Sequence, residues 1–225
     1  MSKQQQQLYG GSHKLSVKAA PSRKLPSKVF VVGTGRSGTH WLARSLRDSG
    51  FSCSMEDHLE MAKKIVLFNR QGLWPRLIQR YHQEKRIVDK SHVLLWEVEK
   101  LAKEFPDAVF VAIKRNEQAT VQSMLKHPGV RAWCADFKRM KIPFPSKMLG
   151  CNSGAEYQGM TLQQRCALRW RVHMDEIDRL EQVLPKDRWL TVDYKSLQEY
   201  GPILTEFLGC SSETPVRIEK RRPRH

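Results

Sequence analysis

The sequence predicts an α/β fold, a single domain with a central parallel sheet flanked by helices. Apolar runs of strand length recur along the chain, rich in Val and Ile and mostly not alternating, which is typical of strands buried on both faces. They lie at 29–32, 87–89, 109–113 and 189–192. Helix-length segments separate them, and strands that alternate with helices form parallel sheets covered on both sides. The 225 residues, 40% of them hydrophobic, suffice for one such core.

The elements follow one another in a regular order. The strand at 29–32 passes into a glycine-rich turn, and helices are expected at 39–47, 55–68, 96–104, 118–125 and 162–184. The last helix carries apolar residues from Cys166 to Leu184 at helical spacing, which gives Trp170 a role in core packing. Ligands of such folds bind at the carboxyl ends of the strands, so residues just after each strand are the candidates for function.

Two extensions flank the predicted domain at 28–215. Residues 1–27 are rich in Gln, Ser, Lys and Gly and have almost nothing to bury, which predicts a disordered leader. Residues 216–225 form a basic tail. Most of the net charge of +16 lies in these ends, with six Lys or Arg and no acid in 1–28 and five against one acid in 216–225. The charge therefore says little about the partner of the folded domain.

Other features exclude several classes of protein. The five cysteines are scattered and contain no CxxC pair, which argues against a zinc site or a disulfide framework and for a reducing compartment. No apolar run approaches membrane-spanning length, and the start "MSKQQQQLYGGSHK" lacks the apolar centre of a secretory signal. We therefore expect a soluble, cytoplasmic protein with no membrane partner and no bound metal.

The glycine-rich turn "GTGRSGTH" is the first candidate site. A strand, a glycine-rich turn and a helix together bind phosphate, because exposed amides and the positive end of the helix dipole converge. A tight turn without a ligand remains an alternative. A Walker A loop fits the spacing of Gly33 and Gly38 but would need a lysine where Thr39 stands.

A dinucleotide fingerprint is a stronger alternative. Three glycines satisfy G-x-G-x-x-G after a strand, and Glu56 or Asp57 follows about 20 residues on. In a dinucleotide fold that acid ends a second strand, whereas the segment "GFSCSMEDHLEMAKK" places both acids at what reads as a helix start.

The whole string "GTGRSGTHWLARSL" resembles the 5'-phosphosulfate loop of the sulfotransferases, enzymes that use 3'-phosphoadenosine 5'-phosphosulfate (PAPS). In that family a basic residue precedes Ser-Gly-Thr, and a tryptophan often follows two positions after the threonine. The corresponding residues here are Arg36, Ser37, Gly38, Thr39 and Trp41. The family usually has lysine at the first position; arginine keeps the charge but offers a different hydrogen-bond fork.

A second stretch resembles the family's 3'-phosphate motif. After the strand at 109–113 comes "RNEQATVQS", in which Arg115 and Ser123 are eight residues apart. The family has the same Arg and Ser at that spacing, on a strand end and the following helix. A cation and a hydroxyl suit the 3'-phosphate of the nucleotide.

The resemblance also implies a catalytic base. Cytosolic sulfotransferases carry Lys-Thr-His between the two phosphate motifs, with the histidine as base, and this maps onto Lys90 and His92. The branch that sulfates polysaccharides uses a glutamate shortly after the first helix, where Glu56 stands as the second choice. Tyr194 falls at the tyrosine that borders the adenosine site, although Lys195 and Ser196 replace the two acids that follow it in many members.

The resemblance implies a nucleotide-binding fold of the P-loop type and transfer of a sulfuryl group from PAPS to a hydroxyl or amine by in-line displacement, leaving adenosine 3',5'-bisphosphate (PAP), with no metal. The implied nucleotide-binding set is Arg36, Ser37, Gly38, Thr39, His40, Trp41, Arg115, Ser123 and Tyr194. Arg36 would neutralise charge on the bridging oxygen, Lys90 would stabilise the sulfuryl group, and Trp41 would stack on adenine. The alternatives are a Rossmann-type dinucleotide-dependent oxidoreductase and a nucleic-acid-binding module that uses the basic ends.

The segment 126–160 is the candidate acceptor-binding element. It interrupts the alternation of strands and helices with prolines, glycines and basic residues, and so long a loop in a compact domain is more often a lid than a spacer. Its cations hint at an anionic or carbohydrate acceptor, although solvated surface charge explains them equally well. These are Arg131, Lys138, Arg139, Lys141 and Lys147. The acceptor expected from the sequence is a small alcohol or a carbohydrate, and the oligomeric state is left open.

Overall fold

The computed structural model describes residues 25–84, 87–135 and 146–219. Their strands form a single parallel sheet in the order β2-β3-β1-β4-β5. The strands are β1 (Lys28–Val32), β2 (Cys53–Ser54), β3 (Ile87–Asp89), β4 (Val109–Lys114) and β5 (Trp189–Asp193). The predicted α/β fold with a central parallel sheet is therefore confirmed.

The sheet separates two apolar cores. Phe30 and Val32 point to one face of β1, where α2, α3, α4, α5 and α9 supply the packing partners. Val29 and Val31 point to the other face, against α1, α10 and Val216. The central strand is thus buried on both faces, as its unbroken apolar sequence predicts.

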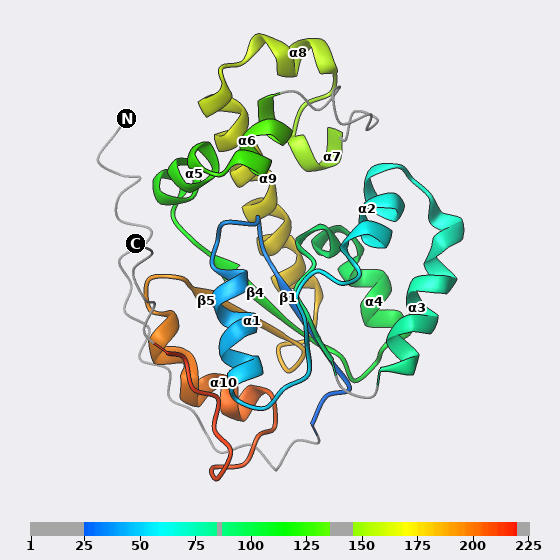
Figure 1. The fold of residues 1–225 in the computed structure, drawn as a ribbon, viewed down its shortest axis with the longest axis vertical. Coiled ribbons are helices and arrows are strands. Elements are labelled where there is room, and N and C mark those ends of the chain that lie inside the picture. The colour runs from blue at the N-terminus through cyan, green and yellow to red at the C-terminus, as the bar shows by residue number, and fades with distance from the viewer. Residues whose placement is uncertain (1–24, 85–86, 136–145, 220–225) are drawn as a thin grey trace.

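The helices have the following bounds in the described residues. They are α1 (Thr39–Asp48), α2 (Leu59–Leu67), α3 (Trp74–Gln83), α4 (Val98–Glu104), α5 (Glu117–Lys126), α6 (Pro128–Ala135), α7 (Ser146–Leu149), α8 (Gly154–Gly159), α9 (Leu162–Val183) and α10 (Gly201–Phe207), with the 3₁₀ turns η3 (Gln71–Leu73), η4 (His92–Glu97) and η5 (Leu197–Tyr200). In Figure 1, α1 lies in front of the sheet and α9 behind it. None of the described helices is long and apolar enough to cross a membrane.

The segment around β2 corrects the sequence prediction. We expected a helix at 55–68, but α2 begins only at Leu59, and Glu56 adopts a positive φ of 81°. Glu56 and Asp57 therefore follow the carboxyl end of a short strand and do not open a helix. The two-residue strand escapes a search for apolar runs, because its length gives no periodicity.

This correction removes the stated objection to a dinucleotide fold, but the strand order supplies a stronger one. In the classic dinucleotide fold the second strand pairs with the first, in the order 3-2-1-4-5-6. Here β3 pairs with β1 and β2 lies at the edge. The strand that carries the acid is thus one position farther from β1 than in the dinucleotide fold.

The segment 126–160 is not a structureless loop. Its described residues form α6, α7 and α8, which lie above the carboxyl end of the sheet together with α5 (Figure 1). The predicted basic residues Lys138, Arg139 and Lys141 fall outside the described residues, as does the side chain of Lys147. Buried Cys134 and Met148 join these helices to the core.

The two chain ends differ in how much the structure describes. Of the predicted leader, 1–24 lie outside the described residues, and so do 220–225 of the basic tail. The backbone amides of Val216 and Arg217 donate to Thr205 Oγ1 at 2.8 Å and to Ser49 Oγ at 3.0 Å, and Val216 is 3% exposed. The first residues of the tail therefore pack on the domain.

Candidate active site

The glycine-rich loop joins β1 to α1 in a tightly curved backbone. Gly35 and Arg36 adopt positive φ angles of 68° and 64°, and Gly38, at the N-cap of α1, has φ of 113°. A Cβ added to Gly38 would lie 2.5 Å from Cδ2 of Tyr194, so only glycine fits there. The Trp41 amide donates to the Gly38 carbonyl at 2.9 Å, so the two amides before it, those of Thr39 and His40, are the ones available to an anion at the start of α1.

A buried hydroxyl in the loop has no protein partner among the described residues. Ser37 is 1% exposed, and its Oγ makes no hydrogen bond there. A buried hydroxyl without a partner is costly, so a ligand oxygen at this point would satisfy it. This orphaned atom, beside a helix N-terminus, fits the phosphate end of a nucleotide.

The loop is tied to α5 and to the residue that follows β4. The Arg36 side chain donates from Nε to Ser123 Oγ at 3.2 Å, and Arg115 donates from Nη1 to the Arg36 carbonyl at 2.9 Å. The Arg115 guanidinium also lies 4.3 Å from the centroid of the Tyr194 ring, a cation–π distance. The two phosphate motifs, far apart in sequence, thus meet, and Arg36 reaches toward the second of them.

These groups line a small cavity of about 90 Å³. Its lining residues are Arg36, Gly38, Thr39, His40, Trp41, Arg115, Ser123 and Tyr194. Apart from Ser37, this is the nucleotide-binding set that the resemblance implies. The Trp41 ring meets Tyr194 edge to face, with centroids 5.7 Å apart, and its Nε1 donates to the Glu219 carbonyl at 3.0 Å.

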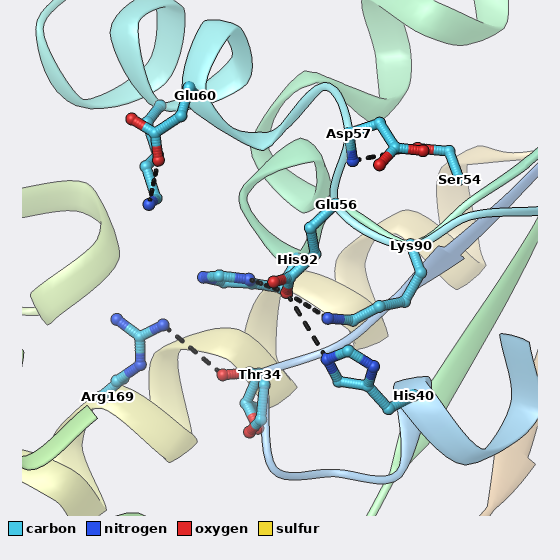
Figure 2. A network of polar contacts seen from close by, with 11 residues as sticks. Thr34, His40, Ser54, Glu56, Asp57, Glu60, Lys90, His92 and Arg169 are labelled. Atoms are coloured by element: carbon cyan, nitrogen blue, oxygen red, sulfur yellow. Dashed lines mark hydrogen bonds and ion pairs between the residues drawn. The ribbon is translucent and has the colours of Figure 1, made fainter. Parts of the chain in front are cut away.

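The two candidate bases lie in one cluster beside the loop. Figure 2 shows the Glu56 carboxylate among Lys90, His92 and His40. The buried Lys90 donates from Nζ to Glu56 Oε1. From the same oxygen, His92 Nδ1 is 3.7 Å away and His40 Nε2 is 3.8 Å away. Glu56 reaches this cluster because it follows β2, whereas Lys90 and His92 follow the neighbouring strand β3.

The cluster shifts the pKa values of both candidates. Burial raises the pKa of the Glu56 carboxyl, but its interactions with His92 and Lys90 outweigh burial and lower that pKa to about 2. Burial lowers the pKa of His92 to about 4, helped by the charges of Arg169 and Lys90 and opposed by Glu56. At neutral pH Glu56 is therefore ionised and His92 is a neutral imidazole whose Nδ1 faces the carboxylate.

A larger cavity of about 340 Å³ opens on the other side of the loop. Arg36, Thr39 and His40 line both cavities, so the two meet at the loop. Glu56, Lys90 and His92 contribute to the larger cavity, and much of the rest of its wall is apolar. The apolar side chains are Leu59, Leu67, Val93, Val130 and Met148.

The sequence reasoning missed one charged residue of this cavity. Arg169 in α9 is 4% exposed, and its Nη2 lies 3.5 Å from the Thr34 carbonyl. A signal was present, because Arg169 stands three residues after Cys166 and eight before Ile177, on the buried stripe of the helix. An arginine in such a stripe indicates either a buried ion pair or a binding site.

Each strand thus contributes to the site through the residues that follow it. The loop follows β1, Glu56 follows β2, Lys90 and His92 follow β3, Arg115 follows β4 and Tyr194 follows β5. Within the described residues, no group of three or more His, Cys, Asp or Glu could hold a metal ion.

Comparison with known proteins gives a consistent result. A model of the sulfotransferase family matches residues 54–200, which begin after the glycine-rich loop. Among curated proteins, no significant match to the chain is found.

Solved structures share the fold. A sulfotransferase from Alicyclobacillus acidocaldarius is similar with a TM-score of 0.53 and 15% identity, over 89% of this chain and 87% of that one. A sulfotransferase domain from the curacin biosynthetic pathway is similar with a TM-score of 0.52 and 16% identity, over 85% of this chain and 77% of that one. A sulfotransferase from Mycobacterium avium is similar with a TM-score of 0.50 and 12% identity, over 85% of this chain and 66% of that one.

Proposed function

The chain belongs to the sulfotransferase family, and on that premise we propose that it transfers the sulfuryl group of PAPS to the hydroxyl of a small-molecule acceptor. The observation that carries the proposal is the pair of cavities that meet at the glycine-rich loop. The smaller one carries the groups proposed for the nucleotide phosphates, and the larger one has room for a small acceptor. Sulfur would lie where they meet, beside Thr39 and Arg36.

In the smaller cavity the nucleotide is held at both phosphates. The 5'-phosphate lies at the N-terminus of α1, where it satisfies Ser37 Oγ. The 3'-phosphate lies between Arg115 and Ser123, and the Arg36 side chain, which contacts Ser123, helps to hold it. The Trp41 and Tyr194 rings offer apolar surface for the adenosine.

The reaction is an in-line displacement at sulfur. The acceptor oxygen forms a bond to sulfur, the bond from sulfur to the 5'-phosphate oxygen breaks, and the acceptor proton passes to His92. The products are a sulfate ester and PAP. Positioning and charge stabilisation supply most of the acceleration, as in phosphoryl transfer.

His92 is the better base of the two candidates. A base must bind a proton during the reaction, and Glu56, with its pKa lowered to about 2, is the weaker proton acceptor. Because Glu56 faces Nδ1, it holds the tautomer that leaves Nε2 open to the acceptor. An ammonium has three donors, and Lys90 gives one to Glu56, so the others can reach the sulfuryl oxygens.

The experiment that tests the nucleotide assignment is a comparison of PAP with adenosine 5'-phosphate. Arg115→Ala should weaken PAP binding about ten- to a hundredfold, the value of a charged hydrogen bond, because the 3'-phosphate loses its cation. Binding of adenosine 5'-phosphate should change little. Calorimetric titration of both nucleotides measures the two effects.

Two further variants sharpen this test. Arg115→Lys keeps the charge and should retain part of the preference for PAP. Arg76→Ala removes an exposed arginine of α3 and should leave both affinities unchanged. Equal losses for both nucleotides in Arg115→Ala would mean that Arg115 supports the loop through the Arg36 carbonyl and does not select the 3'-phosphate.

A further inference from the structure

The larger cavity has a buried guanidinium in its wall, that of Arg169. Arg169 lines it from α9 and does not line the smaller cavity. Figure 2 shows Arg169 and Lys90 on opposite sides of Thr34, with Arg169 reaching the Thr34 carbonyl. Its positive charge also contributes to the low pKa of His92, which places the guanidinium within electrostatic range of the proposed base.

The charges of the cavity wall are unbalanced. Among its described lining residues, one is acidic, Glu56, and that carboxylate already pairs with Lys90. The Lys and Arg residues of the wall are Arg36, Lys63, Lys90 and Arg169. Arg36 contacts Ser123 on the nucleotide side, and Lys63 donates to the exposed Glu60 at 2.7 Å. Lys90 and Arg169 are the two buried cations among them, and Arg169, which contacts the Thr34 carbonyl, is the one with a planar guanidinium.

Another part of the cavity wall is apolar and also buried. Leu67, Val93 and Met148 are 6%, 1% and 2% exposed. The volume of about 340 Å³ is at the lower end of the range for small-molecule sites, roughly 300–1,000 Å³. A molecule that fits these walls has a compact apolar body and a negative charge.

We propose that the acceptor is a small hydroxy acid whose carboxylate binds Arg169, whose apolar body lies against Leu67, Val93 and Met148, and whose hydroxyl faces His92. A carboxylate matches the planar fork of a guanidinium with two parallel hydrogen bonds. This assignment names the substrate class for the proposed function and therefore rests on it.

The test compares hydroxy acids with their uncharged amides. The probes are para-hydroxyphenylacetate and omega-hydroxyhexanoate, each beside its primary amide, titrated by calorimetry into the enzyme saturated with PAP. The acids should bind about ten- to a hundredfold more tightly than the amides, as expected for a charged hydrogen bond. Arg169→Gln should bring the ratio to about one without changing the affinity for PAP, and Arg169→Lys should keep part of the preference.

Lys63→Gln is the matched control, because it removes a half-exposed cation of the same cavity. It should change the ratio less than about fivefold, as for other solvent-exposed charges. Circular dichroism checks that the variants fold; if Arg169→Gln does not, the wild type, Arg169→Lys and Lys63→Gln decide.

Three results would overturn the assignment. They are equal binding of acid and amide by the wild type, binding of neither to an enzyme that holds PAP, and a preference for the acid that survives in folded Arg169→Gln. An enzyme that does not bind PAP at all contradicts the proposed function instead, so the two failures are distinguishable.

Discussion

His92 and Lys90 both face the Glu56 carboxylate, and burial together with these contacts sets the pKa values of the two candidate bases. The pKa of His92 is lowered to about 4 from an ordinary value of 6.5. A base acts in its unprotonated form, so that form is present above pH 4 and is lost as the pH falls through 4. We expect kcat/KM for PAPS to stay level from neutral pH down to about pH 5 and to fall near pH 4, in a stopped assay with labelled PAPS.

Two substitutions show whether His92 is the group that titrates. His92→Ala should lower kcat about a hundredfold or more and leave PAP binding unchanged. Glu56→Gln should lower kcat less, because it removes the carboxylate partner of the His92 imidazole and of Lys90 but leaves the His92 Nε2 in place. A larger loss in Glu56→Gln than in His92→Ala, or a fall in activity near pH 6.5, would contradict these roles.

Among single residues, the sequence located some of the cavity-lining residues and not others. Arg115, Ser123 and Tyr194 could be named because each stands at a fixed distance from a recognisable strand end. The contact between Arg36 and Ser123 could not, because it depends on how the loop curves at Arg36, with its positive φ. Arg169 was missed because it does not follow a strand in the sequence. The packing of α9 brings it to the cavity, and that packing could not be predicted.

At the scale of elements, the glycine-rich loop depends on close contact with the chain after β5. A side chain at Gly38 would clash with the Tyr194 ring. In addition, the backbone φ of 113° at this position would strain any residue that has a Cβ. Gly38→Ala should therefore lower stability by about 1–3 kcal/mol and weaken PAP binding at least tenfold. Thermal melts and PAP titrations measure the two effects.

Substitutions at two other glycines separate the effect of the steric contact from that of the backbone strain. Gly50 has φ of 93° with open space around its Cβ position, so Gly50→Ala should lower stability through backbone strain alone and spare PAP binding. Gly72 lies in η3, also with open space, and Gly72→Ala should change neither. Equal PAP affinity in all three variants would show that the loop tolerates a displaced Tyr194.

The boundaries of helices and strands could be predicted where burial leaves a clear pattern in the sequence. The strands β1 and β4 were predicted within a residue, because both faces are buried and the apolar runs are continuous. The edge strand β5 is only partly buried, and its apolar residues were enough to predict it within a residue. The edge strand β2 could not be predicted, since two residues carry no pattern. The short helices α6, α7 and α8 are stabilised by packing on α9 and by local caps such as Ser153, which propensity alone does not reveal.

At the scale of the whole molecule, the strand order concentrates the site at one edge. The chain builds β2 and β3 on one side of β1 and then crosses to build β4 and β5 on the other. Such a switch leaves a crevice at the carboxyl end of the central strand, where the glycine-rich loop lies. Because all strands are parallel, the residues after each of them converge there, although they are up to about 160 positions apart in sequence.

Because these residues converge from distant parts of the chain, binding of the correct nucleotide should stabilise the whole fold. PAP contacts residues after β1, β4 and β5 in the proposed complex, so its binding stabilises the folded chain over the unfolded one. At a hundred times its dissociation constant, PAP should add about 2.7 kcal/mol and raise Tm by about 5–10 °C for a domain of this size. Differential scanning fluorimetry with PAP, NAD and a short DNA duplex measures the selectivity.

NAD should give no comparable shift, because Glu56, the acid beside the loop, pairs with Lys90 and lines the larger cavity and not the smaller one proposed for the nucleotide phosphates. DNA would act mainly through the basic chain ends, and a shift caused by those charges should disappear when salt is raised to about 200 mM. The PAP shift should survive that salt, since Ser37 and the loop amides bind it inside the fold. A salt-resistant shift with NAD or DNA and none with PAP would contradict the proposed donor.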